Sequence, residues 1–284
     1  MVLAVDALEK TYPNGARAVC GVSFDVGAGE LVALVGESGC GKTTTLKMIN
    51  RLLEPTGGTV LLGGEDACGL DPVALRRRVG WVMQNDGLFP HMSVARNIAV
   101  TPSLLGWDRS RIAARVDELL SLVKLDPDAY RAESPRRLSG GQRQRVGLAR
   151  ALAAEPPLVL MDEPFGALDA ITRHALREDM RTLMHELGFA VVLVTHDMAE
   201  ALLLADRIAI MQGGKMVQYG TPTELLRMPA NAYVARLVET PRREAEAVDR
   251  LLPGGWHGEG PNARMGRRAH GAPAGLSRRA YAIE

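Results

Sequence analysis

The chain has 284 residues, of which 24% are charged and 46% belong to the hydrophobic set. These proportions are ordinary for a folded domain with a large core. The 34 Lys and Arg residues nearly balance the 33 Asp and Glu residues, so the net charge of +1 gives no electrostatic reason to expect a nucleic acid as a partner.

The cysteines and the apolar runs argue against a secreted or membrane-spanning chain. Cys20, Cys40 and Cys68 are too few and too scattered for a disulfide framework or a zinc site, which favours a reducing compartment. The first residues show no basic segment followed by an apolar run, so no secretory signal is visible. Apolar runs such as 31–35 and 190–194 fall far short of the roughly 18–20 residues that span a bilayer. We therefore expect a cytoplasmic chain.

The first part of the chain predicts short strands interrupted by two helices. Asp71 and Pro72 begin the second helix, because Asp caps a helix N-terminus and proline suits the first helical position. The expected strands cover 3–12, 22–26, 31–35, 59–62 and 79–84, and the first helix covers 42–53.

A helical pattern replaces the strands from about residue 86 to residue 155. Strand-like runs return at 157–161 and 190–195. The fold class expected from this order is α/β, with an α-helical subdomain inserted into the core. Apolar residues recur within the insertion at the spacing of one helix face: Ile112, Val116, Leu119, Leu120 and Val123.

A glycine-rich loop joins the apolar strand 31–35 to the helix that follows it. The loop fits the pattern G-x-x-x-x-G-K-[ST], in which backbone N–H groups surround a phosphate and the helix N-terminus adds positive potential. Lys42 would bind the outer phosphates, and Thr43 would offer its hydroxyl to Mg²⁺. A turn that binds nothing is the alternative, which the flanking strand and helix disfavour. The expected nucleotide-binding residues here are Gly36, Glu37, Ser38, Gly39, Cys40, Gly41, Lys42, Thr43 and Thr44.

Two acids end the apolar strand over 157–161. Ligands of parallel sheets lie at the carboxyl ends of the strands, so Asp162 is placed to hold Mg²⁺ directly or through its waters. Glu163 stands beside it and could polarise the water that attacks a phosphate. Because Pro164 follows, a helix N-cap is the alternative role for either acid.

The segment Leu138–Gln142 begins a strongly patterned helix over 144–153 with Ser-Gly-Gly, which is a second candidate anion site. One nucleotide hardly needs two such sites from one chain. This predicts a two-fold dimer in which the Ser139 site of each chain covers the triphosphate of the other. An ordinary capped helix is the alternative.

In the order of its motifs, the sequence resembles the nucleotide-binding subunits of ABC transporters over about residues 1–230. Residues 36–43 match the Walker A loop of that family, and 158–164 match Walker B. The resemblance implies that Tyr12 stacks on adenine and that Gln84 senses Mg²⁺ and the membrane partner. Tyr12 could instead be a half-buried strand aromatic, and Gln84 a hydrogen-bonded amide at a strand end.

Three further segments match the family. Ser139, Gly140, Gly141 and Gln142 belong to the LSGGQ signature at 138–142. Asp169 matches the D-loop acid that crosses the dimer interface, although it could be a simple helix cap. His196 matches the switch histidine that bonds the γ-phosphate and holds water and Glu163 in line, although it could be a packing histidine.

The resemblance also implies an architecture and partners. It implies a P-loop NTPase domain over 1–240, in which N-terminal antiparallel strands and an inserted helical subdomain surround a RecA-like parallel sheet, followed by a poorly ordered Gly/Pro/Arg-rich tail over 241–284. The expected ligands are ATP and Mg²⁺. The expected partners are a second copy in an ATP-sandwich homodimer, two transmembrane permease subunits and, indirectly, an extracytoplasmic solute-binding protein. This places the chain at the cytoplasmic face of the membrane.

Two segments narrow the resemblance to the importers of quaternary-amine osmoprotectants, such as glycine betaine, choline, carnitine and proline betaine. These segments are Thr45–Pro55 and Gly87–Met92, which are expected near the permease rather than near the solute. Importers of polar amino acids or methionine share parts of both and remain an alternative. ABC-type ATPases that act on DNA or ribosomes usually carry long coiled-coil insertions or two cassettes, and this chain shows no sustained heptads.

The sequence departs from the family pattern in three places. Arg136 and Arg137 precede the signature where an acid is usual, and Cys40 stands where Ser or a similar small residue is common. The printed sequence also ends without paired regulatory domains, so we expect no gating through such a domain. An electropositive loop would lower the pKa of the Cys40 thiol, which predicts selective alkylation of Cys40 and protection by ATP.

Overall fold

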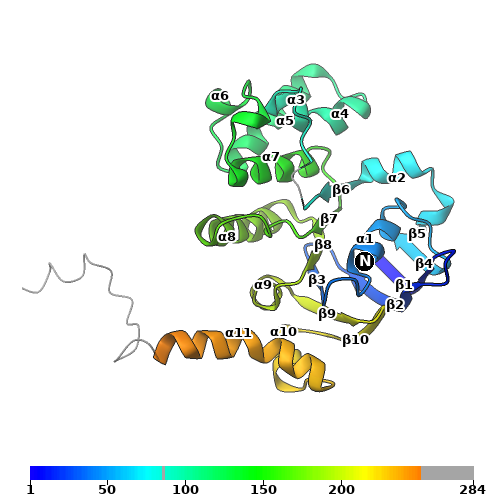
Figure 1. Ribbon diagram of the computed structural model, residues 1–284. Coiled ribbons are helices and arrows are strands. Elements are labelled where there is room, and N and C mark those ends of the chain that lie inside the picture. Colours follow the sequence, from blue (N-terminus) through cyan, green and yellow to red (C-terminus); the bar gives the residue numbers. More distant parts are fainter. Residues whose placement is uncertain (85–86, 251–284) are drawn as a thin grey trace, which may run out of the picture. The chain divides into compact units, whose positions relative to one another are not determined.

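The computed structural model describes residues 1–84 and 87–250. Residues Met1–Pro241 form one compact unit, and a second unit begins at Arg242. Within the described residues, the strands of the larger unit form a four-stranded sheet and a six-stranded sheet, with helices on both sides of the latter (Figure 1).

The smaller sheet is antiparallel and has the order β2-β1-β4-β5. Leu3, Val5 and Leu8 of its central strand are buried, so one face of the sheet packs on the core. The second strand begins at Arg17, earlier than the expected 22–26. The bounds are β1 (Leu3–Thr11), β2 (Arg17–Val26), β4 (Gly57–Leu62) and β5 (Glu65–Asp66).

The larger sheet has the order β10-β9-β3-β8-β7-β6, parallel except for the edge strand β10. Every residue of β3 and β8 is buried, which explains the continuous apolar runs in the sequence. The bounds are β3 (Leu31–Val35), β6 (Val79–Val82), β7 (Leu158–Asp162), β8 (Ala190–Thr195), β9 (Arg207–Gln212) and β10 (Lys215–Gly220).

Alternate residues of β3 enter two separate cores. Leu31, Ala33 and Val35 pack with the helices on one face, and Val32 and Leu34 pack with the antiparallel sheet on the other. Strand β3 is therefore fixed on both faces at the point where it delivers the glycine-rich loop.

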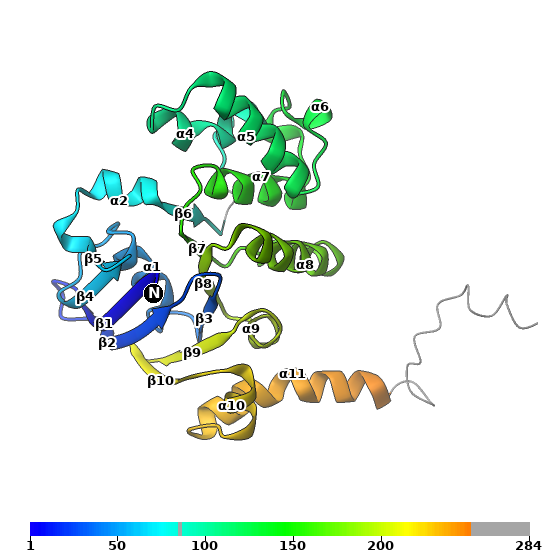
Figure 2. The ribbon, with the colours of Figure 1, turned by 180° about the vertical axis from the view of Figure 1, so that it is seen from behind.

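A group of short helices lies between β6 and β7 in the sequence and gathers beside α8 in space (Figures 1 and 2). The α/β class and the helical insertion predicted from the sequence are both present. The inserted helices are α3 (Val94–Ile98), α4 (Val100–Leu104), α5 (Arg109–Leu122), α6 (Pro127–Tyr130), the 3₁₀ turn η2 (Pro135–Arg137) and α7 (Gly140–Leu152). The other helices are α1 (Lys42–Ile49), the 3₁₀ turn η1 (Ala67–Gly69), α2 (Pro72–Arg78), α8 (Ala170–Leu187), α9 (Met198–Leu204), α10 (Pro222–Arg227) and α11 (Ala232–Arg250).

Two helix ends differ from the expected ones. Helix α1 ends at Ile49 instead of near residue 53, because Arg51 adopts a left-handed backbone with φ of 45°. The Arg51 guanidinium holds this turn by donating to the carbonyl of Leu70 at 2.6 Å and to that of Ala67 at 3.1 Å. Helix α7 begins at Gly140, ahead of the expected residue 144, because Ser139 caps it.

The C-terminal segment also differs from the expected tail. Helix α11 runs through Pro241 to Arg250, past the boundary expected between residues 240 and 241. The rest of the expected tail, 251–284, lies outside the described residues. Across the residues that the structure does describe, no helix is both long enough and apolar enough to cross a membrane.

Candidate functional site

The glycine-rich loop turns tightly between β3 and α1. At Gly36 a Cβ atom would lie 2.2 Å from the carbonyl oxygen of Met211, and at Gly41 it would lie 2.4 Å from that of Ala18. Both positions therefore require glycine. The loop residues Glu37, Ser38 and Gly39 are exposed, Cys40 and Gly41 are buried, and Thr43 and Thr44 are half-buried at the start of α1.

Lys42 folds back across this loop. Its ammonium group donates to the carbonyl oxygen of Gly36 at 2.7 Å and to that of Glu37 at 2.9 Å, and the residue is only 6% exposed. These two bonds hold the Lys42 amino group at the loop, where a bound phosphate would meet it.

Thr43 connects the loop to the acidic strand end. Its hydroxyl donates to Asp162 Oδ1 at 3.0 Å, from the first turn of α1 to the end of β7. Burial raises the pKa of Asp162, and the hydrogen bond from Thr43 partly offsets this effect. Within the described residues no group of three or more His, Cys, Asp or Glu side chains could hold a metal ion. A hydroxyl and one carboxylate suit Mg²⁺, which binds few protein oxygens and completes its shell with phosphates and water.

Three neighbouring parallel strands bring Gln84, Glu163 and His196 together. Gln84, Glu163 and His196 follow β6, β7 and β8 respectively, and the carboxyl ends of these strands meet at one edge of the sheet. Gln84 Nε2 donates to Glu163 Oε2 at 3.1 Å, and His196 Nδ1 lies 3.2 Å from Glu163 Oε1. Glu163 adopts a left-handed backbone with φ of 46°, an arrangement that is uncommon for a residue with a side chain and is often found at functional sites.

The signature segment lies elsewhere in the chain. Ser139 caps α7, since its hydroxyl accepts from the N–H of Gln142 at 3.3 Å and its own N–H donates to Gln142 Oε1 at 2.8 Å. The amide of Gln142 also donates to the hydroxyl of Tyr130 at 2.9 Å. A Cβ at Gly141 would lie 2.4 Å from Thr172 Cγ2 of α8, and one at Gly140 would have Leu168 as its nearest neighbour at 3.9 Å.

Asp169 and Tyr12 lie at separate places on the surface. Asp169 caps α8 by accepting from the N–H of Thr172 at 3.0 Å. Tyr12 follows the end of β1, is 37% exposed, and has the ammonium of Lys10 at 5.7 Å from its ring centroid. The sequence allowed a helix cap as the alternative role of Asp169 and of Ser139. Both caps are present in the single chain.

The expectation for the cysteines needs correction. Cys40 is only 5% exposed, and its Sγ lies 3.8 Å from the ammonium of Lys42. Cys68 is exposed. Selective alkylation requires access of the reagent as well as a favourable charge, so the burial of Cys40 contradicts its expected preference.

Sequence reasoning missed a polar cluster beside His196. It consists of Arg177, Thr195, Asp197 and Glu200, and Glu200 is 3% exposed. Burial raises the pKa of Glu200 despite its hydrogen bond from Thr195. The spacing of Asp197 and Glu200, an N-cap residue with an acid three positions later, was the available signal.

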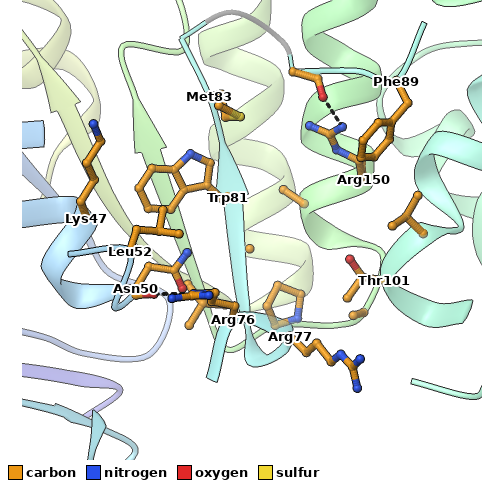
Figure 3. A pocket seen from close by; sticks show the side chains of 17 residues that line it. Lys47, Asn50, Leu52, Arg76, Arg77, Trp81, Met83, Phe89, Thr101 and Arg150 are labelled. Carbon is orange, nitrogen blue, oxygen red and sulfur yellow. Dashed lines mark hydrogen bonds between the residues drawn. The ribbon is translucent and has the colours of Figure 1, made fainter. Parts of the chain in front are cut away.

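A groove opens beside the strand that leads to Gln84. Its volume is about 490 Å³, and Trp81, Leu52 and Phe89 supply apolar surface (Figure 3). Arg150 donates to the carbonyl of Gly87 at 2.7 Å and so fixes one wall. The groove includes residues from both segments that were expected near a permease, 45–55 and 87–92.

Comparisons with known proteins identify related chains. Residues 19–166 match the ABC transporter family. The chain is 49% identical over 257 residues to the glycine betaine/carnitine/choline transport ATP-binding protein OpuCA of Bacillus subtilis, covering 88% of this chain and 67% of that protein. It is 51% identical over 233 residues to the carnitine transport ATP-binding protein OpuCA of Listeria monocytogenes, covering 82% of this chain and 58% of that protein.

A solved structure agrees with these matches. The structure of cbiO1 from Clostridium perfringens, part of the ABC transporter complex cbiONQ, superposes with a TM-score of 0.75 at 26% identity. It covers 87% of this chain and 98% of that one. The chain thus spans between 58% and 67% of the length of the two curated relatives and nearly all of the solved subunit.

Proposed function

Because this chain belongs to the ABC transporter family, we propose that it is the ATP-hydrolysing subunit of an importer of quaternary-amine osmoprotectants such as glycine betaine, choline, carnitine or proline betaine. Two relatives that are about half identical over most of the chain are named as ATP-binding proteins, one for the transport of glycine betaine, carnitine and choline and the other for the transport of carnitine. Their agreement favours this solute class over polar amino acids or methionine.

One observation carries the catalytic part of the proposal. Glu163 touches Gln84 and His196 at the ends of three adjacent strands, and the neighbouring Asp162 touches Thr43 of the phosphate loop. A carboxylate held between an amide and an imidazole, next to a phosphate loop, is the arrangement needed to hold a water molecule against a bound triphosphate.

Each side chain has a stated task in this mechanism. Lys42 would leave the carbonyls of Gly36 and Glu37 and bind phosphate oxygens instead. Thr43 and Asp162 would hold Mg²⁺, which would offset negative charge on the phosphates. Glu163 orients the attacking water and accepts its proton at a carboxylate oxygen. Because a carboxylate and a phosphate both only accept hydrogen bonds, His196 can donate from Nδ1 to Glu163 and from Nε2 to the γ-phosphate at the same time only when both ring nitrogens carry a proton.

The signature segment suggests a dimer. In the single chain Ser139, Gly140 and Gly141 begin α7, beside Leu168 and Thr172, and Figure 1 shows α7 in the helical group, away from α1 and its phosphate loop. A second copy related by two-fold symmetry would bring this helix start to the triphosphate of its partner. Asp169, Ser139 and Tyr12 would then contact the nucleotide or the partner chain.

The groove of Figure 3 suggests where the membrane subunits bind. Three apolar residues on its lining are well exposed, namely Leu52 at 52%, Met83 at 47% and Phe89 at 40%. Exposed apolar surface in a concave site marks a place where another protein docks. We assign this groove to a segment of a permease subunit. Binding of that segment would hold the chain at the cytoplasmic face of the membrane and would couple the position of Gln84 to the permease.

The solute is tested with the whole transporter in vesicles. The chain is reconstituted with its permease subunits and solute-binding protein, and ATP hydrolysis is measured with glycine betaine, choline, carnitine, proline betaine, methionine and a polar amino acid. Stimulation by one or more quaternary amines alone supports the proposal. Stimulation only by methionine or the polar amino acid would show that the proposed solute class is wrong, and it would leave the ATPase role intact.

A further inference from the structure

Arg177 of α8 reaches into the segment that carries His196. Its guanidinium donates from Nε to Glu200 Oε1 at 3.2 Å and from Nη2 to Asp197 Oδ2 at 3.2 Å. The Arg177 side chain is 14% exposed and that of Glu200 only 4%, so this contact is shielded from water on the Glu200 side. Charge-assisted bonds in such a place are strong and directional.

Both neighbours of His196 are tied into the same cluster. The hydroxyl of Thr195 donates to the Glu200 carboxylate and accepts from the N–H of Asp197 at 3.0 Å. Asp197 in turn caps α9 by accepting from the N–H of Glu200 at 3.1 Å. The backbone is therefore held immediately before and immediately after His196.

The fixed backbone determines where the imidazole lies. The side chain of His196 is 64% exposed, and the contact between its Nδ1 and Glu163 Oε1 is 3.2 Å long. Because so exposed a ring has little packing of its own, the course of the chain from Thr195 to Asp197 decides whether it meets Glu163. Small displacements of a catalytic group have large effects on rate.

Helix α8 is anchored on its other side to the helical group. Asp179 pairs with Arg145 of α7 at 2.6 Å and with Lys124 at 2.5 Å, and the Asp179 side chain is 4% exposed. Residues two apart on a helix point to different sides, so Arg177 and Asp179 face different neighbours. Helix α8 lies between α7 and α9 in both views (Figures 1 and 2). Helix α8 thus connects α7, which begins with the signature segment, to the segment that carries His196.

We propose that Arg177 is a positioning residue, which holds His196 against Glu163 through Asp197 and Glu200 and so links α8 to the hydrolytic site. The inference rests on the proposed function, in which Glu163 and His196 act on ATP. The residue type matters, because the planar guanidinium fork bonds two carboxylates at once, whereas the single ammonium of lysine is a point charge.

The test measures turnover of Mg-ATP by the reconstituted transporter with single and paired substitutions. Arg177→Met should lower kcat about 10- to 100-fold with KM unchanged, and Arg177→Lys should recover part of the loss. In a His196→Ala background, measured in single turnover, Arg177→Met should cause no further loss, because the residue acts only through His196. Arg207→Lys is the matched control, since Arg207 pairs with Asp25 and Glu30 at a distant site and should leave kcat unchanged.

A second pair of variants separates positioning from stability. Arg177→Met leaves the buried Glu200 carboxylate with its bond from Thr195 but without the guanidinium that pairs with it, and should lower Tm. Arg177→Met with Glu200→Gln removes that charge and should restore Tm. Positioning predicts that kcat stays low in the double variant. Recovery of kcat together with Tm would overturn the proposal. The proposal would also be overturned if Arg177→Met lowered the rate as much in the His196→Ala background as it does in the unaltered protein. Full turnover by His196→Ala alone would contradict the role of His196 in the proposed function. The His196→Ala variant therefore distinguishes a failure of the proposed function from a failure of the Arg177 proposal alone.

Discussion

At the scale of single residues, Glu163 is the side chain on which the proposed mechanism of hydrolysis depends most directly. Its left-handed backbone is held by its own N–H donating to the carbonyl of Val194 at 2.9 Å and by the N–H of Gly166 donating to its carbonyl at 3.2 Å. The surrounding chain thus enforces an uncommon conformation that turns the carboxylate toward Gln84 and His196.

Glu163→Gln should keep ATP binding and lose turnover, giving a stable ATP-bound dimer. Glutamine has nearly the same shape and can still bond Gln84, but it cannot accept a proton, so kcat should fall about 100-fold or more. Binding of a fluorescent ATP analogue and phosphate release measure the two properties. Glu178→Gln removes an exposed carboxylate from α8 and serves as the control. Near-normal phosphate release by Glu163→Gln would remove Glu163 from the catalytic role.

The cysteines give a second residue-scale prediction. A maleimide should modify Cys68 before Cys40, because Cys68 is exposed, whereas Cys40 within the phosphate loop is only 5% exposed. Mass spectrometry of peptides after brief labelling measures the order, and labelling in denaturant shows that all three thiols can react. Faster modification of Cys40 in the folded protein would mean that the loop opens widely in solution.

The motif residues were predictable because each is fixed by its neighbours in sequence. Lys42 and Thr43 begin the helix that follows β3 and its glycine-rich loop, and Asp162 ends the apolar strand β7, so their position at this edge of the sheet follows from the chain order. Arg177 could not be found this way. Its partners lie 20 and 23 positions away, and only the packing of α8 against α9 brings them together.

At the scale of elements, the close contact between α7 and α8 makes a sharp prediction. Gly141→Ala would place a methyl group 2.4 Å from Thr172 Cγ2, so the Thr172 side chain must rotate or the two helices must separate, at a cost of about 1–3 kcal/mol in the free energy of unfolding. Thermal unfolding of the purified chain measures this.

Two further variants control for the altered helix start. Gly140→Ala meets nothing closer than Leu168 at 3.9 Å and should be neutral or slightly stabilising, since alanine favours helix. Gly141→Ala combined with Thr172→Ser, which removes the obstructing methyl, should regain stability. Equal destabilisation by Gly140→Ala and Gly141→Ala would show that the contact with Thr172 is not the cause.

Continuous apolar runs predicted the central strands well. The expected strands at 31–35 and 190–195 coincide with β3 and β8, because strands buried on both faces need no alternation. The edge strand β10, half-buried except for the exposed Lys215, was not predicted, and neither was its neighbour β9. The end of α1 was also missed, because it depends on bonds from Arg51 to a turn about twenty positions further along.

At the scale of the whole molecule, the expected nucleotide-site residues all lie between Tyr12 and His196. Deletion of residues 251–284 should therefore leave ATP hydrolysis by the reconstituted transporter unchanged. The comparison requires equal amounts of assembled complex, measured by gel densitometry. A large loss of hydrolysis in the shortened chain would place part of the machinery in the deleted segment.

The two segments proposed to bind phosphate belong to different parts of one chain. The phosphate loop lies between β3 and α1, whereas the Ser139 helix start contacts Leu168 and Thr172 near α8. A second copy supplies the missing half of each site in the proposed arrangement. Turnover then depends on association, and each molecule should work only while it is paired.

The most direct test is the rate of ATP hydrolysis per molecule as the purified chain is diluted, with its oligomeric state followed by mass photometry in the same samples. Our account predicts that the rate per molecule falls in step with the fraction of dimer formed in the presence of ATP. An unchanged rate per molecule in samples that contain only monomers would contradict it.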